Sequence, residues 1–390
     1  MTISFWLDAA VGEKKKEDFD VAIVGSGVSG AASAYWLSRR QGLKVALLDS
    51  AATGSGASGR SGGFVLRGVM AYYNHAVRSY GRDAARFIFQ LNEQTQAHLS
   101  DFVKAEGNSF DYQRCGSYLL ASSIEELHDL AESAQLMRED GFEVEYLKED
   151  PLERGFYGAL HNQCDIGVNP LSLVRSLIQA SSVQVYENES VFRIECNASQ
   201  GVELFTANRI IRAAKVLLCT NAFLPLLLPE FRSMLKPVRG QILLTRPVEE
   251  RFLDKLCYAN FGYEYFRQLP DGRLLLGGCR EPFLQEESSY EDTVTLNVQT
   301  ALRNYLKDRF PELAGASIDY KWSGIMCFTP DGLPLIGEIH DKPGVFFMSG
   351  CNGHGLGYSL ALSRVLVETA LDGADPGIFQ SKRVLNLSKH

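Results

Sequence analysis

The chain has 390 residues, with 45% hydrophobic and 22% charged side chains, so it is long enough for two domains with ample cores. Its formal net charge of -8 argues against nucleic acid as a partner. No apolar run reaches the length of a membrane span, and the cysteines lack C-x-x-C spacing, which disfavours a metal site and a disulfide framework and favours a cytoplasmic location.

The first predicted element follows an N-terminal leader, residues 1–18, whose Lys14–Lys16 cluster is interpreted as a solvated linker. Val21–Val24 is a short apolar run typical of a buried parallel strand, and the segment GSGVSG follows it at once. An apolar-periodic helix then runs to Leu37, and Lys44–Leu48 predicts a second strand. This order predicts a dinucleotide-binding βαβ unit, without choosing between NAD and FAD.

Each part of this unit has a mechanical role. Gly25 permits the tight turn, Gly27 lets the backbone approach a pyrophosphate, and Gly30 lets the helix pack on the strand. The helix N-terminus would hold phosphate charge, and Asp49 is placed to accept hydrogen bonds from a ribose hydroxyl. The predicted cofactor-binding residues of this unit also include Ser26, Val28, Ser29 and Ser50.

The next segment, AATGSGASGRSGGF at 51–64, is rich in glycine and serine and has two interpretations. One is a flexible linker. The other is a cofactor loop whose backbone forms anion-binding nests, with Arg60 adding charge. The second is favoured because the loop comes straight after the ribose-binding acid. The cofactor-binding residues that it predicts are Ser58, Gly59, Arg60, Ser61, Gly62 and Gly63.

Two insertions interrupt the nucleotide-binding pattern. The first predicts helices at Tyr80–Glu106 and Ile124–Asp140. The second predicts antiparallel strands, among them Cys257–Arg267, and a helix at Ser289–Phe310. Alternation along the predicted strand would put three aromatic residues on one face, as sheet core or as the wall of a substrate site. These residues are Phe261, Tyr263 and Tyr265.

The chain returns twice to the nucleotide-binding sheet. The predicted strand Lys215–Cys219 ends in the small polar pair Thr220-Asn221. Val345–Met348 predicts a further strand, and the glycine-rich turn Ser349–Gly357 leads from it into a helix. Because ligands of such sheets bind at the carboxyl ends of the strands, both segments are expected at the cofactor edge.

These pieces together resemble the FAD-dependent amine and amino-acid oxidases of the D-amino-acid oxidase superfamily. The resemblance rests on GSGVSG with Asp49, on GASGRSGG at 56–63, on TPDGLPLIG at 329–337 and on GHG at 353–355. It covers nearly the whole chain, and the loop and the N-terminal SFWLDAA are most similar to the gamma-glutamylputrescine oxidase branch. It implies FAD rather than NAD, with non-covalent binding as the favoured form.

The resemblance implies an α/β fold, in which a Rossmann-like FAD-binding domain is interleaved with an α+β substrate domain. The substrate domain would be built on a mixed, largely antiparallel sheet. The FAD-binding domain would consist of residues 19–70, 150–235 and 323–380, and the substrate domain of residues 71–149 and 236–322.

The same resemblance implies further site residues. Val191 would contact adenine through its backbone, and Asp331 falls in a flavin-side PDG motif. The last glycine turn would lie at the pyrimidine edge of the flavin, where the helix dipole and His354 would stabilise negative charge. The cofactor-binding residues predicted in these segments are Val191, Thr220, Asn221, Gly324, Asp331, Gly353, His354, Gly355, Leu356 and Gly357.

Two positions depart from the family pattern. Met326 stands where glycine-oxidase-like members have an arginine that binds the substrate carboxylate, and a thioether cannot form that bidentate pair. The sequence therefore favours an amine, or a substrate whose acid is held elsewhere. Leu275 stands where sarcosine oxidases have an oxygen-activating lysine, so oxygen and another electron acceptor both stay open. Four arginines are candidates to replace the arginine that is absent at position 326: Arg60, Arg239, Arg267 and Arg280.

The predicted function is oxidation of a C–N bond of an amine or N-substituted amino acid, by hydride transfer to flavin N5 and hydrolysis of the resulting imine. Three alternatives stay open: a glycine-type or D-amino-acid oxidase, an FAD-dependent alcohol dehydrogenase, and a non-catalytic flavin-binding subunit. An oligomer or heteromer is compatible with the sequence. The residues predicted to act in catalysis are His354, Arg60, Tyr263, Tyr265 and Met326.

Overall fold

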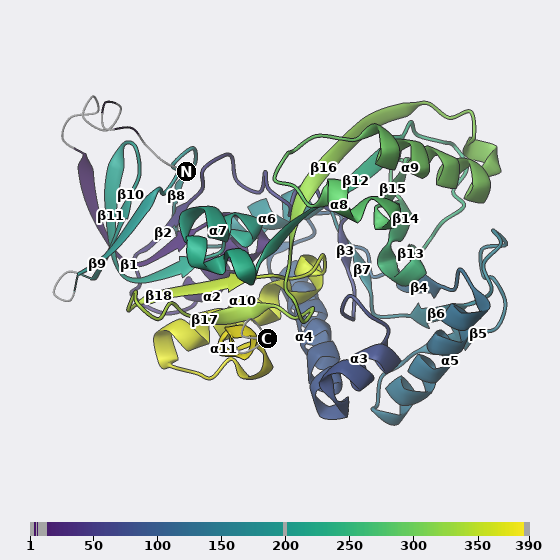
Figure 1. The fold of residues 1–390 in the computed structure, drawn as a ribbon, viewed down its shortest axis with the longest axis horizontal. Coiled ribbons are helices and arrows are strands. Elements are labelled where there is room, and N and C mark those ends of the chain that lie inside the picture. Colours follow the sequence, from purple (N-terminus) through teal and green to yellow (C-terminus); the bar gives the residue numbers. More distant parts are fainter. Residues whose placement is uncertain (1–3, 5, 7–13, 198–200, 386–390) are drawn as a thin grey trace.

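The computed structural model describes residues 4, 6, 14–197 and 201–385, and it contains two large sheets that stand side by side (Figure 1). The predicted leader lies mostly outside the described residues. Its last part does not form a linker, because the first strand already begins at Lys15 and pairs there with Arg209.

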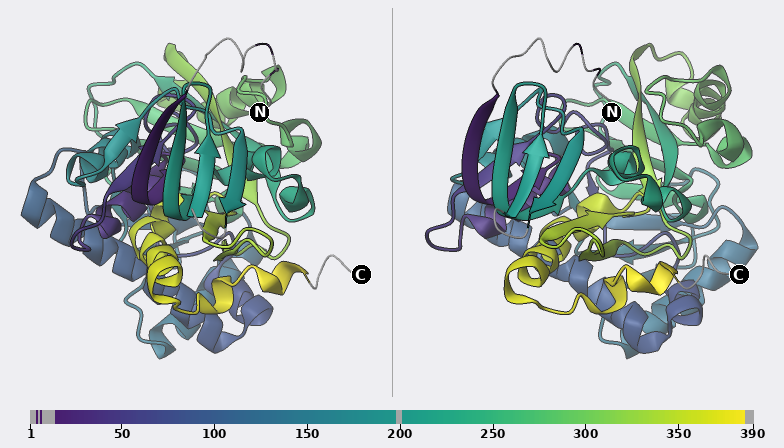
Figure 2. Two further views of the ribbon diagram at one scale, coloured as in Figure 1. Left: turned by 90° about the vertical axis from the view of Figure 1, so that its left-hand side faces the viewer. Right: turned by 60° about the vertical axis from the view of Figure 1, so that its left-hand side comes forward.

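The first sheet is built around the predicted βαβ unit. Its strands are β1 (Lys15–Val24), β2 (Val45–Leu48), β8 (Gln184–Tyr186), β9 (Arg193–Asn197), β10 (Gly201–Phe205), β11 (Arg209–Leu218), β17 (Leu335–Glu338) and β18 (Val345–Ser349). The order is β17-β18-β11-β1-β2-β8, and β10 pairs with β11 while β9 pairs with β10. Strands β1, β2, β8, β11 and β18 run parallel, and Figure 2 shows β1 beside the strands of residues 201–218. The predicted Rossmann-like arrangement is confirmed.

The second sheet is mixed and largely antiparallel, as predicted. Its strands are β4 (Ser117–Leu120), β5 (Glu145–Leu147), β6 (Ala159–Asn162), β12 (Lys236–Thr245), β13 (Leu256–Ala259), β14 (Glu264–Gln268), β15 (Leu274–Gly278) and β16 (Ile318–Phe328). The order is β16-β12-β15-β14-β13-β4-β6-β5, and β13 pairs in parallel with β4. A short pair, β3 (Phe64–Val65) and β7 (Ile166–Gly167), forms a separate ladder.

Helices cover both sheets (Figure 1). The longer ones are α2 (Val28–Leu37), α3 (Tyr73–Tyr80), α4 (Arg82–Glu106), α5 (Ile124–Glu139), α6 (Pro170–Gln179), α9 (Leu296–Arg309) and α10 (Gly355–Asp372). Short helical turns are α7 (Leu224–Leu227), α8 (Leu284–Glu287), α11 (Lys382–Leu385), η1 (Asn221–Phe223), η2 (Pro229–Ser233), η3 (Asn260–Gly262), η4 (Glu281–Phe283), η5 (Pro311–Leu313) and η6 (Gly377–Phe379). Helix α10 packs on both α2 and α4 and so joins the first sheet to the helices of the first insertion.

Local sequence signals set several of these elements. Strand β1 alternates between two cores, since Val21 and Ile23 pack on one face and Ala22 and Val24 on the other. Helix α5 begins after Ser123, whose hydroxyl accepts a hydrogen bond from the Glu126 N–H at 3.2 Å, as an N-cap should. None of the described helices is long and apolar enough to cross a membrane.

Two predicted elements are wrong. The predicted strand Cys257–Arg267 is broken by η3, because Phe261 has a left-handed backbone (φ 54°). The predicted helix Ser289–Phe310 begins only at Leu296, since the preceding residues are drawn into polar contacts with β12. The domain boundaries stay a prediction: β6 belongs to the second sheet although it lies within residues 150–235, and β16 runs across the proposed boundary at 322 and 323.

Candidate active site

The turn between β1 and α2 has no room for side chains. Gly25 has φ +103°, and a Cβ there would lie 2.5 Å from the Cys219 carbonyl oxygen. A Cβ on Gly30 would overlap the carbonyl oxygen of Gly25. The glycines therefore keep the first turn of α2 close to β1, which forms a cradle at the helix N-terminus that fits a pyrophosphate.

Two side chains close this cradle. Ser58 places its hydroxyl at the helix N-terminus, where it accepts a hydrogen bond from the Val28 N–H at 2.8 Å. Asp49, at the end of β2, accepts hydrogen bonds from the N–H and the hydroxyl of Ser26, both at 2.7 Å, and from the Ala51 N–H at 3.0 Å. Asp49 thus lies beside the glycine turn, as a ribose-binding acid must.

The glycine-serine loop is a compact set of turns and not a flexible linker. The Gly59 N–H donates to the Gly54 carbonyl at 3.0 Å and the Ser61 N–H to the Ser58 carbonyl at 3.3 Å. Arg60 points away from the turn of α2. Its guanidinium pairs with Asp292 at 2.7 Å and donates to the Ser323 carbonyl at 3.0 Å, which ties the loop to β16.

The ends of β11 and β18 meet at the same edge. The Thr220 hydroxyl is buried without a hydrogen-bond partner, a polar group that a bound ligand would satisfy. Asn221 instead holds protein segments together, since its side chain donates to the Ile325 carbonyl at 3.1 Å and its own carbonyl accepts from Ser349 at 3.0 Å. Val191 is buried nearby in the core that includes β2 and β8.

The turn between β18 and α10 contains His354 immediately before the helix begins at Gly355. Asn352, with φ 49°, accepts a hydrogen bond from the Thr329 N–H at 2.9 Å and so joins this turn to the PDG segment. The carboxylate of Asp331 in that segment accepts a hydrogen bond from Arg383 Nε at 2.7 Å. Gly357 lies against the backbone of Leu66, where a Cβ would be 2.5 Å from the carbonyl oxygen.

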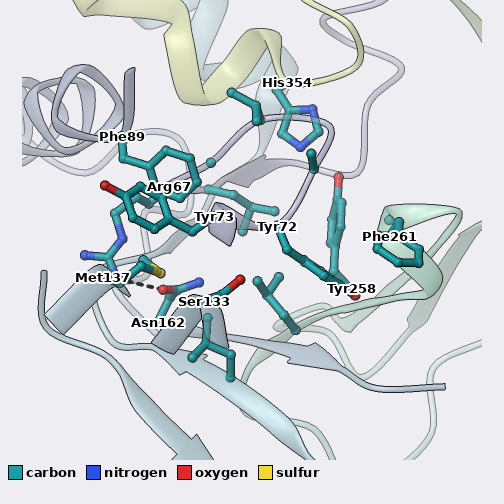
Figure 3. Close-up of a pocket in the computed structure, with 17 residues that line it drawn as sticks. Arg67, Tyr72, Tyr73, Phe89, Ser133, Met137, Asn162, Tyr258, Phe261 and His354 are labelled. Carbon is teal, nitrogen blue, oxygen red and sulfur yellow. Dashed lines mark hydrogen bonds between the residues drawn. The ribbon is translucent and has the colours of Figure 1, made fainter. Parts of the chain in front are cut away.

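His354 is a neutral imidazole in this position. Burial lowers its pKa, and the nearby positive charge of Arg280 lowers it further, although a hydrogen bond to the Asn352 carbonyl opposes both. Its Nδ1 lies 3.1 Å from that carbonyl, which only accepts, so Nδ1 carries the proton and Nε2 presents a lone pair. Figure 3 shows the ring directed into a pocket.

That pocket is the candidate substrate site, and most of its wall is apolar or aromatic (Figure 3). Its free volume of ≈ 30 Å³ is room for about one water molecule. Phe261 stacks on Tyr72, with ring centroids 4.7 Å apart, and on His75, with centroids 5.7 Å apart. Its lining residues include Tyr72, Tyr258, Phe261 and His354, together with Arg67, which pairs with Glu93.

The prediction that Phe261, Tyr263 and Tyr265 share one face of a strand is wrong in part. Because η3 interrupts the strand, Phe261 reaches the pocket from a turn, and its N–H donates to Glu126 at 3.0 Å. Tyr265 does stand on β14, stacked on Tyr258 with centroids 5.8 Å apart, while Tyr263 lies beneath the guanidinium of Arg280. The contribution of Tyr72 was missed, since nothing in its local sequence indicates that Glu126 holds its hydroxyl.

Glu264 stands between Tyr263 and Tyr265 in the sequence. Its side chain is 9% exposed, and burial raises its pKa to about 7. Between about pH 4.5 and 7 the folded chain then binds more protons than the unfolded chain, so stability falls as pH rises through this window. We expect Glu264→Gln to remove this fall and to raise the free energy of unfolding at pH 8 by up to about 3 kcal/mol relative to wild type. Urea unfolding at pH 5 and pH 8 measures this difference. The control is Glu249→Gln, at an exposed position that does not act on Glu264, and an unchanged pH dependence in the Glu264 variant would refute the expectation.

Met326, Cys327 and Cys351 do not line this pocket and lie instead at the final glycine turn. Along β16, residues Gly324, Met326 and Phe328 share the partly exposed face, while Ile325 and Cys327 are buried. The Met326 sulfur lies next to the final glycine turn, 3.5 Å from where a Gly353 Cβ would be. Burial raises the pKa of Cys327 to about 11 and that of Cys351 to about 12, so neither thiol is a nucleophilic thiolate at neutral pH.

The fold and the glycine cradle define a dinucleotide-binding protein. A family model described as FAD dependent oxidoreductase matches residues 20–369, and the chain belongs to this family, DAO. The predicted family, the oxidoreductase class and FAD as cofactor are therefore confirmed. The buried, unpartnered Thr220 hydroxyl and the glycine cradle fit that cofactor.

Individual relatives agree with this assignment. The gamma-glutamylputrescine oxidoreductase of Escherichia coli (strain K12) is 27% identical over 371 residues, which cover 90% of this chain and 83% of the relative. The glycine oxidase of Pseudomonas aeruginosa is 28% identical over 372 residues, covering 91% and 95%. The crystal structure of glycine oxidase from Geobacillus kaustophilus superimposes with a TM-score of 0.78 at 24% identity, covering 92% of this chain and 95% of that one, which supports the fold.

Proposed function

We propose that the protein oxidises a C–N bond of an amine or an N-substituted amino acid. The observation that carries this proposal is His354, which lies beside the final glycine turn and faces a pocket with an aromatic wall (Figure 3). The gamma-glutamylputrescine oxidoreductase and glycine oxidase named above act on compounds of this kind, as their names state. When bound, FAD supplies a two-electron acceptor for the hydride that leaves the carbon next to nitrogen.

The protein's own groups would bind and orient the substrate. The His354 Nε2 lone pair accepts a hydrogen bond from the substrate nitrogen, which favours an orientation with the adjacent C–H directed at the cofactor edge. Tyr258 of the aromatic wall, on which Tyr265 stacks, excludes water from the reacting carbon. Both hydroxyls stay protonated, because burial raises the pKa of Tyr258 well above its usual range and that of Tyr265 to about 12.

The cofactor residues predicted from the sequence form part of the proposal. The turn of Gly25, Gly27 and Gly30 with Asp49 and Ser58 would hold the pyrophosphate and ribose, and the final glycine turn the flavin ring. Arg60, Asn221 and Asp331 are proposed to shape the site from outside, since their side chains are engaged with Asp292, Ile325 and Arg383. FAD is proposed to be bound non-covalently.

An anaerobic panel of amines, amino acids and alcohols tests the proposal on the purified FAD-loaded protein. We expect amines to bleach the visible flavin absorbance and alcohols to leave it unchanged. Bleaching by alcohols alone would favour a dehydrogenase of hydroxyl groups, and a stable oxidised flavin with every compound would favour a non-catalytic subunit. Repeating the positive cases in air separates oxygen from other electron acceptors.

Substitution of Met326 tests the substrate class more closely. Met326→Arg is expected to improve kcat/KM for glycine and other small amino acids about 10- to 100-fold, because a charge-assisted pair with their carboxylate is worth about 1.5–3 kcal/mol. Met326→Gln, similar in size but uncharged, is the matched control and should give no such gain. If neither substitution changes amino-acid turnover, Met326 does not face the substrate.

A further inference from the structure

The buried side chain of Asn352 ties the final glycine turn to the end of β16. Its amide oxygen accepts a hydrogen bond from the Thr329 N–H at 2.9 Å. Its amide nitrogen donates to the Thr329 hydroxyl at 3.2 Å and to the Gly350 carbonyl at 2.5 Å. The Asn352 N–H donates to the Cys327 carbonyl at 3.0 Å. The side chain and the backbone of one residue therefore fix this turn.

The backbone at this position narrows the choice of residue. Asn352 has φ 49°, a left-handed conformation that asparagine adopts more readily than most residues with a side chain. Gly350, two residues earlier, has φ +74°, and a Cβ there would lie 2.3 Å from the Thr329 methyl carbon. The turn and Thr329 are thus in close contact, and Asn352 supplies both the backbone conformation and the hydrogen bonds that this contact needs.

The carbonyl of Asn352 orients His354. It lies 3.1 Å from Nδ1 of the imidazole, and because a carbonyl only accepts, it keeps the proton on Nδ1. A free neutral imidazole prefers the proton on Nε2, so the wild-type tautomer depends on this contact. The His354 N–H donates to the Cys351 carbonyl at 2.8 Å, which holds the backbone of the ring in the same turn.

A second turn, residues 329–333, supports Asn352 from the side away from the pocket. The Thr329 hydroxyl donates to the Leu333 carbonyl at 2.9 Å. Arg383 of α11 donates to the same carbonyl at 2.7 Å and to the Asp331 carboxylate at 2.7 and 3.3 Å. The Tyr80 hydroxyl of α3 donates to the Asp331 carbonyl at 2.9 Å. Contacts from α11 and α3 therefore fix the segment that binds Asn352.

We propose that Asn352 is a positioning residue that sets the tautomer and the direction of His354, with Arg383 supporting it through the turn of residues 329–333. The proposal rests on the proposed function, in which the Nε2 lone pair of His354 receives the substrate nitrogen. Hydride leaves from the neutral amine, and a neutral amine can donate to this lone pair only if its nitrogen carries a hydrogen. The substrates are therefore primary or secondary amines, since a neutral tertiary amine has no N–H.

Two-bond ¹H–¹⁵N correlation spectra of the FAD-loaded protein, labelled with ¹⁵N-histidine, test the tautomer without turnover. His354→Gln assigns the signal among the 7 histidines. At pH 8 we expect wild-type His354 to carry its proton on Nδ1. Asn352→Gly leaves the left-handed backbone accessible but removes the amide, so the signal should shift toward the Nε2–H form. Asn352→Asp, which keeps the acceptor for the Thr329 N–H, should retain part of the wild-type signal.

The rate of anaerobic flavin reduction by the fastest primary or secondary amine gives the second readout. We expect Asn352→Gly to lower it at least 10-fold and Arg383→Met about 3- to 10-fold, with unchanged FAD content. Arg383→Lys should recover most of the rate. The exposed Arg303→Met makes the same change of charge and should behave as wild type. Circular dichroism checks that each variant is folded, and Arg383→Met carries the test if Asn352→Gly is not.

A wild-type His354 with its proton on Nε2 would overturn the proposal, as would a tautomer that is unchanged in both Asn352→Gly and Arg383→Met. Loss of FAD or of stability with a wild-type tautomer would show that Asn352 is only structural. A tertiary amine that reduces the flavin as fast as its secondary counterpart would overturn the substrate class. A shifted tautomer together with a flavin that no amine reduces would keep the positioning role and reject only the proposed function.

Discussion

Replacing Gly30 by Val is expected to abolish FAD binding, with a Kd raised at least 100-fold. A Cβ at this position overlaps the carbonyl oxygen of Gly25. Because this oxygen is a backbone atom, no change of side-chain rotamer can relieve the overlap. Helix α2 would have to move off β1, and the N–H groups at its start would no longer converge on the pyrophosphate. Flavin content after purification and FAD titration by fluorescence quenching measure the effect.

Gly56→Ala is the matched control, because a Cβ on Gly56 meets nothing within 4 Å and its backbone is not left-handed. This variant should keep a full complement of FAD. Circular dichroism and thermal unfolding of the Gly30 variant then distinguish an apoprotein that folds from one that does not. A Gly30→Val protein purified with stoichiometric FAD would contradict the proposed cradle in either case.

Replacing Glu287 by Leu is expected to lower the free energy of unfolding by about 3–5 kcal/mol. The carboxylate is fully buried and receives hydrogen bonds from Arg239 at 2.8 and 3.0 Å, from Gln241 at 3.0 Å and from Thr295 at 3.1 Å. Its removal leaves the charge of Arg239 buried without a counter-ion. Urea unfolding followed by circular dichroism measures the loss.

The double variant Arg239→Met/Glu287→Leu is the control for this prediction. It removes both charges and replaces them with apolar side chains, so it should recover most of the lost stability. A single variant that loses less than about 1 kcal/mol, or a double variant as unstable as the single one, would show that the ion pair does not carry this stability.

The parts of the fold that depend only on residues close together in the sequence were predictable from it. The β1–α2–β2 unit follows from its apolar runs and glycine spacing, and α5 and α6 follow from the caps at Ser123 and Asn169. The break at Phe261 was not predictable in this way. Its left-handed backbone is held by Glu126, 135 residues earlier in the chain, so the aromatic alternation in the local sequence gave the wrong element.

The candidate site was likewise predictable only where it depends on residues close together in the sequence. The roles proposed for the glycine cradle and Asp49 follow from sequence spacing alone, and the structure brings these residues together at one edge. The arginines could not be sorted from the sequence, because their partners come from distant segments: Asp292 for Arg60 and Glu287 for Arg239. For the same reason the sequence could not show that Arg280 lies between the rings of Tyr263 and Phe328, which come from other strands or turns.

We propose that this FAD-dependent oxidoreductase oxidises a C–N bond, and the stoichiometry of a single anaerobic turnover tests this most directly. The substrate is the secondary amine from the panel that bleaches the flavin fastest. Oxidation of its C–N bond consumes one water and releases one aldehyde or keto acid and one primary amine for each FAD reduced. We predict these products in a 1:1:1 ratio with reduced flavin, measured by mass spectrometry after rapid quenching. Flavin reduction without release of the amine would contradict the account.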